Sequence, residues 1–206
     1  MILWLALGIV QDDTGKAKAL LDAVAGEMKN AKAISFYCQI QRSGKEELEE
    51  IQVCLKRPNL GRFTFTEGER EYVYVLDGTT FWSYFADRNE YSKMAQTAEQ
   101  EKSVWAGILP ILFFAKSSDL PEFGKGVTCS RETEEDIPYD VVQWGPDGKY
   151  TVWIDPEKAV RKFRMRTSGK DGPSEKIVDC GDVELDPELE EDAFTFTPPK
   201  DAKEGD

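Results

Sequence analysis

The sequence predicts a mainly β protein with a small helical part, in which an antiparallel meander curls over an apolar interior. Three observations support this prediction. Most of the chain consists of short segments in which polar and apolar residues alternate, the pattern of a strand with one buried face. The connections between these segments are short and contain Gly, Asp and Asn, as expected between antiparallel neighbours. One amphipathic segment precedes the strands and one apolar segment interrupts them, which accounts for the helices.

The first residues of the 206-residue chain are similar to a secretion signal. Residues 1–10 are apolar over the length of a signal-peptide core, and Ala6 and Gly8 offer small residues at a cleavage spacing. The run is too short to span a bilayer. We expect residues 1–12 to form a signal-peptide-like segment that directs the protein to the periplasm. Because no Lys or Arg precedes the run, a buried or interfacial N-terminal segment is the alternative.

One domain is expected over residues 13–202, followed by a frayed tail at residues 203–206. It begins with a helix that Asp13 or Thr14 can cap. The apolar positions of this helix share one face: Ala17, Leu20, Leu21, Val24 and Met28. The expected strands form two groups, the first at 36–41, 51–56, 62–66, 72–76, 80–84 and 90–94, the second at 125–132, 137–144, 149–154, 159–166, 176–183 and 193–197.

An apolar segment at residues 98–116 separates the two groups of strands. Residues 104–115 carry no charge and are apolar on nearly every side, yet they are too few to cross a membrane. Pro110 should break or kink a helix formed here. Such a helix either covers a cavity as a lid or fills the core as an ordinary buried helix.

The four cysteines, Cys38, Cys54, Cys129 and Cys180, allow three pairings. If the first two strands form a hairpin that turns at residues 43–45, Cys38 and Cys54 lie about opposite each other. We therefore expect a bridge between these two, and one between Cys129 and Cys180 by elimination. Disulfides require an oxidising compartment, in agreement with export. The alternative is four reduced, buried cysteines.

The composition argues against an enzyme and against nucleic-acid binding. The chain contains no histidine, so catalytic triads and pairs that use it, and histidine-dependent zinc and iron sites, are absent. The acidic run at 182–192 lacks the spacing and glycine of a calcium loop, which favours a solvated connection over a metal site. The net charge of −13 repels nucleic acids and anionic membranes. We expect no cofactor, no metal and no catalysis; a hydrolase built on two carboxylates stays the open alternative.

Three motifs, in their order and spacing, resemble the LolA family of periplasmic lipoprotein carriers. They are Lys-Arg-Pro-Asn-Leu at 56–60, Asp-Gly-Thr-Thr-Phe-Trp-Ser-Tyr at 77–84 and Phe-Thr-Phe-Thr-Pro-Pro at 194–199. The resemblance covers about residues 16–202. It implies an incomplete antiparallel β-barrel, or half barrel, whose mouth is covered by helices and which encloses an apolar cavity for lipoprotein acyl chains. It also implies that the protein has no catalytic activity and that donor and acceptor proteins of the cell envelope are possible partners.

The resemblance also suggests site residues. The family arginine that hydrogen-bonds the lid backbone when the cavity is empty corresponds to Arg57, whereas Gly61 stands where the carriers have an aromatic residue. Strand alternation allows about half of the candidate lining residues to face inward. The lining candidates are Phe63, Phe65, Tyr72, Tyr74, Phe81, Trp82, Trp153 and Phe163, and the lid candidates are Trp105, Leu109, Leu112 and Phe113.

We therefore expect a monomeric periplasmic carrier or binder of lipoprotein acyl chains or a similar hydrophobic ligand. Relatives with this fold also act as sensors. A non-catalytic sensor or protein-interaction module on the same fold is the alternative.

Overall fold

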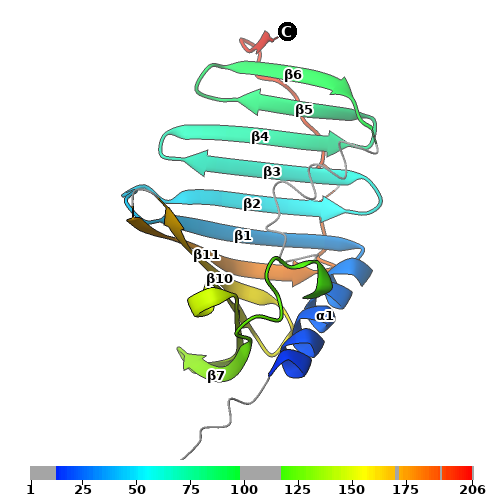
Figure 1. Ribbon diagram of the computed structural model, residues 1–206. Helices are drawn as coiled ribbons and strands as arrows, with labels where there is room; N and C mark the ends of the chain where they lie inside the picture. Colours follow the sequence, from blue (N-terminus) through cyan, green and yellow to red (C-terminus); the bar gives the residue numbers. More distant parts are fainter. Residues whose placement is uncertain (1–12, 98–116, 170–171, 191, 206) are drawn as a thin grey trace, which may run out of the picture.

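The computed structural model describes residues 13–97, 117–169, 172–190 and 192–205, and its main feature is one large open sheet (Figure 1). The described elements are α1 (Thr14–Asn30), β1 (Ala33–Arg42), β2 (Glu49–Lys56), β3 (Leu60–Glu67), β4 (Arg70–Asp77), β5 (Thr80–Phe85), β6 (Glu90–Ala95), β7 (Thr128–Glu134), β8 (Ile137–Trp144), β9 (Tyr150–Ile154), β10 (Val160–Gly169), β11 (Gly172–Leu185) and β12 (Lys203–Glu204). Two short 3-10 helices, η2 (Ser117–Asp119) and η3 (Pro146–Gly148), complete them. The predicted half barrel covered by helix is confirmed, since the sheet does not close.

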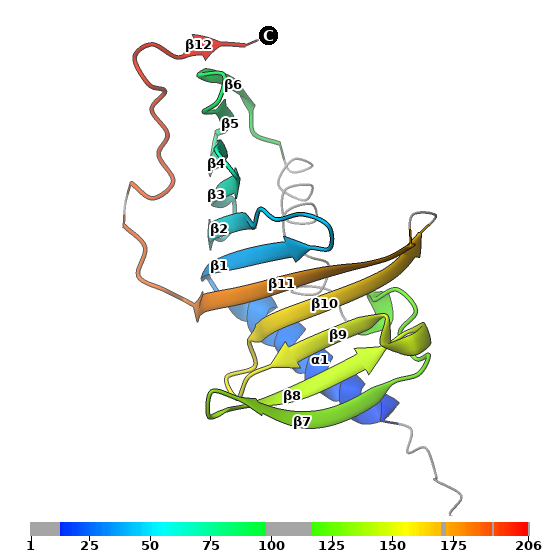
Figure 2. The ribbon, with the colours of Figure 1, turned by 90° about the vertical axis from the view of Figure 1, so that its left-hand side faces the viewer.

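Two antiparallel meanders join to make the sheet, whose strand order is β12-β6-β5-β4-β3-β2-β1-β11-β10-β9-β8-β7. Consecutive strands pair within β1 to β6 and within β7 to β11, and the pairing of β1 with β11 connects the two meanders. The sheet twists so strongly that Figure 2 shows β2 to β6 nearly edge-on and β8 to β11 face-on. The pairing of β1 with β11 is therefore the junction that joins the two meanders into one sheet.

The predicted disulfides are wrong, because the register of the first hairpin differs from the expected one. Cys38 lies opposite Ile51, and Cys54 lies opposite Ser35. Since side chains alternate between faces, this register places Cys38 and Cys54 on opposite faces of the sheet. Cys38 instead faces Cys180 across the junction of β1 and β11 and forms a disulfide with it, while Cys54 and Cys129 are free.

Helix α1 lies across one face of the second meander, where it supplies much of the core (Figure 2). Ala17, Leu21, Val24 and Met28 are buried, as the helical periodicity predicts, whereas the predicted Leu20 is only partly buried and Ala25 is buried as well. The four predicted residues belong to one core cluster with Val142, Trp144 and Val152. Each fully buried Leu, Val or Met side chain contributes roughly 1.5–3 kcal/mol, so packing on the sheet holds this helix in place.

The chain after β11 forms a strap along the face of the first meander opposite to α1 (Figure 2). Asp186 anchors its start by accepting hydrogen bonds from the backbone N–H groups of Lys32 and Ala33. Further on, the Phe196 ring packs 5.7 Å from the rings of Trp82 and Tyr84. The strand expected at 193–197 is therefore wrong: these residues form a turn and an extended segment without strand pairing.

The strap ends in β12, which pairs in parallel with β6. Residues 203–204, which the sequence analysis places in a frayed tail, thus belong to the edge of the sheet. The signal-peptide-like segment at residues 1–12 lies outside the described residues. No helix that the structure describes has the length and apolarity needed to span a bilayer.

Candidate ligand pocket

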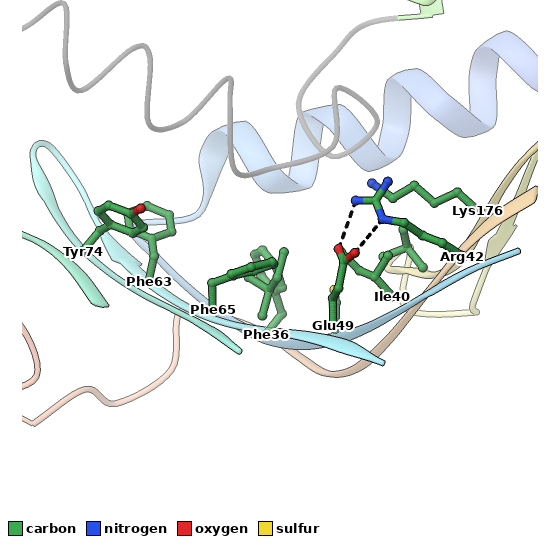
Figure 3. A pocket seen from close by; sticks show the side chains of 11 residues that line it. Phe36, Ile40, Arg42, Glu49, Phe63, Phe65, Tyr74 and Lys176 are labelled. Carbon is green, nitrogen blue, oxygen red and sulfur yellow. Dashed lines mark hydrogen bonds and ion pairs between the residues drawn. The ribbon is translucent and has the colours of Figure 1, made fainter. Parts of the chain in front are cut away.

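A pocket of about 340 Å³ opens on the face of the sheet that also carries α1 (Figure 3). Five strands contribute its lining, because β1 to β4 and β11 each direct alternate side chains to this face. The lining residues are Phe36, Cys38, Ile40, Arg42, Glu49, Ile51, Phe63, Phe65, Tyr74, Lys176 and Val178. The pocket thus straddles the junction between β1 and β11, and the Cys38–Cys180 disulfide crosses that junction at the pocket wall.

Most of this lining is aromatic or aliphatic. Phe63 is 1% exposed and lies opposite Tyr74 in the register of β3 and β4. The Tyr74 ring stacks on Phe81 at 6.1 Å, and the Phe65 ring lies 5.8 Å from that of Tyr72. Partial burial raises the pKa of the Tyr74 hydroxyl. The aromatic side chains therefore form one continuous apolar surface suited to a hydrocarbon chain.

The opposite end of the pocket is charged. Arg42 donates two hydrogen bonds to Glu49, from Nε to Oε1 at 2.7 Å and from Nη2 to Oε2 at 3.0 Å. Lys45 Nζ lies 3.3 Å from the same Glu49 carboxylate and 2.7 Å from Glu67. The hydrogen bonds from Arg42 lower the pKa of Glu49, whose side chain is only 5% exposed. Glu49 is thus a buried anion that is fully neutralised by its neighbours.

Lys176 stands directly opposite Arg42 in the pairing of β1 with β11. Its pKa is lowered, first by desolvation and then by the nearby positive charge of Arg42. Among the residues that the structure describes, Lys176 has no ion-pair partner. The pocket therefore has a long apolar part and, at one end, a half-buried lysine.

The expected lining residues divide between the two faces of the sheet. Phe63, Phe65 and Tyr74 line the pocket, while Tyr72 and Phe81 share its face without lining it. Trp82 does not join them, because it pairs with Val75 and points to the opposite face, where Nε1 donates to Asp77 at 2.9 Å.

Two lining candidates lie in the second meander, away from the pocket. Trp153 is 6% exposed but does not belong to the core cluster, and its Nε1 donates to Glu132 at 2.9 Å. Phe163, by contrast, is buried in the core cluster. The lid candidates Trp105, Leu109, Leu112 and Phe113 lie outside the described residues, so the lid stays a prediction.

Several pocket residues were missed by the sequence reasoning. They are Phe36, Ile40, Arg42, Glu49, Ile51, Lys176 and Val178. The alternation of Phe36, Cys38 and Ile40 along one strand was a usable signal, since it places all three on one face. Arg42, Glu49 and Lys176 gave no such signal, because three different strands bring them together.

Arg57 binds the end of α1. Its Nε donates to the carbonyl of Ala31 at 2.9 Å and its Nη2 to the carbonyl of Met28 at 3.2 Å. The last carbonyls of a helix lack partners within the helix and carry partial negative charge, so a guanidinium is well suited to this position. The family resemblance implied an arginine that hydrogen-bonds the backbone of the lid. These two hydrogen bonds of Arg57 go to the end of α1, and the expected lid lies outside the described residues, so a lid contact stays a prediction.

Gly61 is a structural requirement of the pocket wall. A Cβ at this position would lie 3.0 Å from Phe63 Cε2, 3.1 Å from Leu55 Cδ2 and 3.3 Å from Leu76 Cδ1. Phe63, two residues further along the same face of β3, therefore leaves no room for a side chain at Gly61.

In the described part of the chain, no three His, Cys, Asp or Glu side chains come together as metal ligands would. No protein-family model and no curated protein sequence matches the chain.

Solved structures do match. An uncharacterized conserved protein from Thermus thermophilus is 13% identical, with 92% of this chain and 98% of that chain covered and a TM-score of 0.56. The lipoprotein LppX from Mycobacterium tuberculosis is 13% identical, with 85% of this chain and 98% of that chain covered and a TM-score of 0.51. MucB is 14% identical, with 89% of this chain and 63% of that chain covered and a TM-score of 0.51. At these identities the likenesses show the fold alone. The fold is LolA-like, as the sequence predicts.

Proposed function

We propose that this protein is a non-catalytic carrier or binder of lipoprotein acyl chains or of a similar hydrophobic ligand. The observation that supports the proposal best is the apolar pocket of about 340 Å³ on the helix-bearing face of the open sheet. A volume of this size lies within the range of small-molecule sites, and its walls are mainly aromatic and aliphatic.

The burial of hydrocarbon supplies the binding energy. Each methylene group that leaves water contributes about 0.8 kcal/mol, so ten methylenes give roughly 8 kcal/mol before the cost of immobilising the chain is subtracted. Phe36, Phe63 and Val178 form the buried floor of the pocket. Phe65 and Tyr74 are half-buried and have more surface free for these contacts. No polar group of the ligand needs to react, so no catalytic residue is required.

An envelope location fits this role. The Cys38–Cys180 disulfide suits an oxidising compartment such as the periplasm. The signal-peptide-like residues 1–12 and the likeness to the lipoprotein LppX support the same proposal. In that compartment the pocket would meet acylated proteins and lipids, and donor or acceptor proteins of the envelope could deliver or remove the cargo by binding one state of the protein better than the other.

The second candidate is a non-catalytic sensor or protein-interaction module on the same fold. The net charge of −13 favours it, because an acidic surface attracts a basic protein partner. Pull-downs from envelope extracts would separate the two roles. Recovery of lipoproteins together with bound lipid supports the carrier, whereas recovery of basic, non-acylated proteins supports the module.

A pair of matched variants on neighbouring residues of β3 tests the carrier. Phe65→Asp places a charge in the pocket, and Thr64→Asp places the same charge on the opposite face of the same strand. Delipidated wild-type protein and Thr64→Asp should bind a palmitoylated peptide, as measured by isothermal titration calorimetry, and Phe65→Asp should bind it at least tenfold more weakly. Absence of binding to the wild type, or equal binding by both variants, would refute the proposed function.

A further inference from the structure

The charged end of the pocket has an unbalanced positive charge. Three cations, Arg42, Lys45 and Lys176, meet two carboxylates, Glu49 and Glu67. The carboxylates are engaged by Arg42 and Lys45, which leaves Lys176 as the extra cation. This excess is unusual in a chain of net charge −13, where acidic side chains are plentiful.

Lys176 also lies where a charge is costly. It pairs with Arg42 on one side and with Met165 on the other, so its neighbours in the sheet are a second cation and an apolar side chain. Side chains directly opposite each other in an antiparallel pair are about 4.5–5.5 Å apart at Cβ, and like charges at that distance repel. Desolvation and Arg42 both lower the pKa of Lys176, and the smaller opposing effect of Glu49 does not cancel them. An anion held here would offset both effects.

Arg42 can assist in holding such an anion. A guanidinium has five N–H groups, and Glu49 accepts from only one N–H at Nε and one at Nη2. The remaining N–H groups belong to a side chain that lines the pocket beside Lys176. Together the two side chains offer several donors to a carboxylate or phosphate, which is the type of recognition at which lysine and arginine are effective.

The apolar surface begins next to this charged end and leads away from it. Ile40 follows Arg42 on β1, then come Phe36 and Phe65, and Tyr74 lies at the far end (Figure 3). From β11 to β4 the sheet crosses four strand spacings of about 4.8 Å each, or about 19 Å. A single extended acyl chain matches this length.

We propose that the pocket selects amphiphiles with an anionic headgroup, a carboxylate or a phosphate, which Lys176 and Arg42 bind while the acyl chain lies along the aromatic surface toward Tyr74. This inference rests on the proposed function and adds to it the polarity and orientation of the ligand. Neutral amphiphiles of the same chain length bind more weakly, because they leave Lys176 without an anion.

Probes with the same sixteen-carbon chain test the inference. Palmitate, hexadecyl phosphate and neutral hexadecanol are titrated into delipidated protein in competition with a fluorescent fatty-acid analogue. The wild type should bind both anionic probes about tenfold more tightly than hexadecanol, as expected for a charge-assisted hydrogen bond in a half-buried site. Acetate and inorganic phosphate at the same concentrations should not compete, because they lack the chain.

Three variants locate the headgroup. Lys176→Met should lose the preference for the anionic probes and keep the affinity for hexadecanol, and Lys176→Arg should retain the preference. Lys93→Met removes an exposed lysine opposite Trp82 and should behave as the wild type. Circular dichroism and thermal unfolding confirm that each variant is folded.

The outcomes are distinguishable. Equal affinity of the wild type for palmitate and hexadecanol, or an undiminished preference in Lys176→Met, overturns the inference and leaves the proposed function intact. Competition by acetate or phosphate as strong as by palmitate also overturns it, because it would show a site for small anions. Failure of all three amphiphiles to bind the wild type overturns the proposed function itself.

Discussion

The disulfide between Cys38 and Cys180 makes a quantitative prediction about stability. It closes a loop with a sequence separation of 142 and connects the two meanders at β1 and β11. The chain-entropy model gives about 5 kcal/mol for a loop of this size, and removal of a native disulfide costs about 2–5 kcal/mol in practice. Both cysteines are 2% exposed, so a Cys38→Ala, Cys180→Ala double variant also loses some packing.

The assay is urea unfolding of the oxidised wild type, the double variant and Cys54→Ser, whose thiol takes no part in the bridge. The double variant should lose about 2–5 kcal/mol of unfolding free energy, and Cys54→Ser should lose less than about 1 kcal/mol. Reductant should destabilise the wild type but leave the double variant unchanged. Thiol titration of the unfolded, oxidised wild type should count two free cysteines. Four free thiols would show that the bridge does not form, and equal stability of the double variant and Cys54→Ser would show that it does not stabilise the fold.

Three further predictions concern single residues around the pocket. Gly61→Ala should lower the unfolding free energy by about 1–3 kcal/mol, because the added methyl group overpacks against Phe63. The control is Gly26→Ala in α1, where a Cβ would have nothing within 4 Å, and it should raise the unfolding free energy by about 0.5–1 kcal/mol. Thermal unfolding measures both variants. Arg57→Met removes two hydrogen bonds from the end of α1 and should lower the unfolding free energy by about 1 kcal/mol, which an unchanged midpoint would disprove. The pKa of Glu49 is lowered in the folded state, so the stability that Glu49 contributes is present above a pH of about 4.3 and is lost as the pH falls through the folded pKa. Glu49→Gln should therefore weaken the loss of stability at acidic pH when the unfolding free energy is measured against pH. An unchanged loss would contradict a stabilising role of the Glu49 carboxylate.

The strands and the helix could be predicted because each has a local signal. Alternation marks β1 to β6 and β8 to β11, and the apolar stripe marks α1. At residues 193–197 the same alternation predicted a strand that does not form. Here Phe194 is buried and Phe196 packs against Trp82, but the strap that carries them does not pair with a strand. A strap and an edge strand can share one sequence pattern, because both bury alternate side chains against a sheet.

The disulfide and the charged end of the pocket could not be predicted, because both depend on pairing between distant strands. The register of β1 and β2 is set by the six residues 43–48, whose turn geometry no residue pattern specifies. The contact of β1 with β11 joins Cys38 to Cys180 and Arg42 to Lys176 across more than 130 residues. By contrast, Phe63, Phe65 and Tyr74 were among the lining candidates because they are aromatic residues on expected strands, and they do line the pocket. Strand parity limited the candidates to about half but could not say which half, since that depends on which face of the sheet carries the pocket.

The central claim, that the pocket face of β1 to β4 holds an acyl chain, is tested most directly by photo-crosslinking. A palmitate analogue with a diazirine near the end of its chain is irradiated with the delipidated protein, and the modified residues are mapped by mass spectrometry. An acyl chain in the pocket should give adducts at Phe36, Phe63, Phe65 or Tyr74, which line it. Adducts at Trp82 or Phe196 on the opposite face, or no adduct that excess palmitate suppresses, would contradict it.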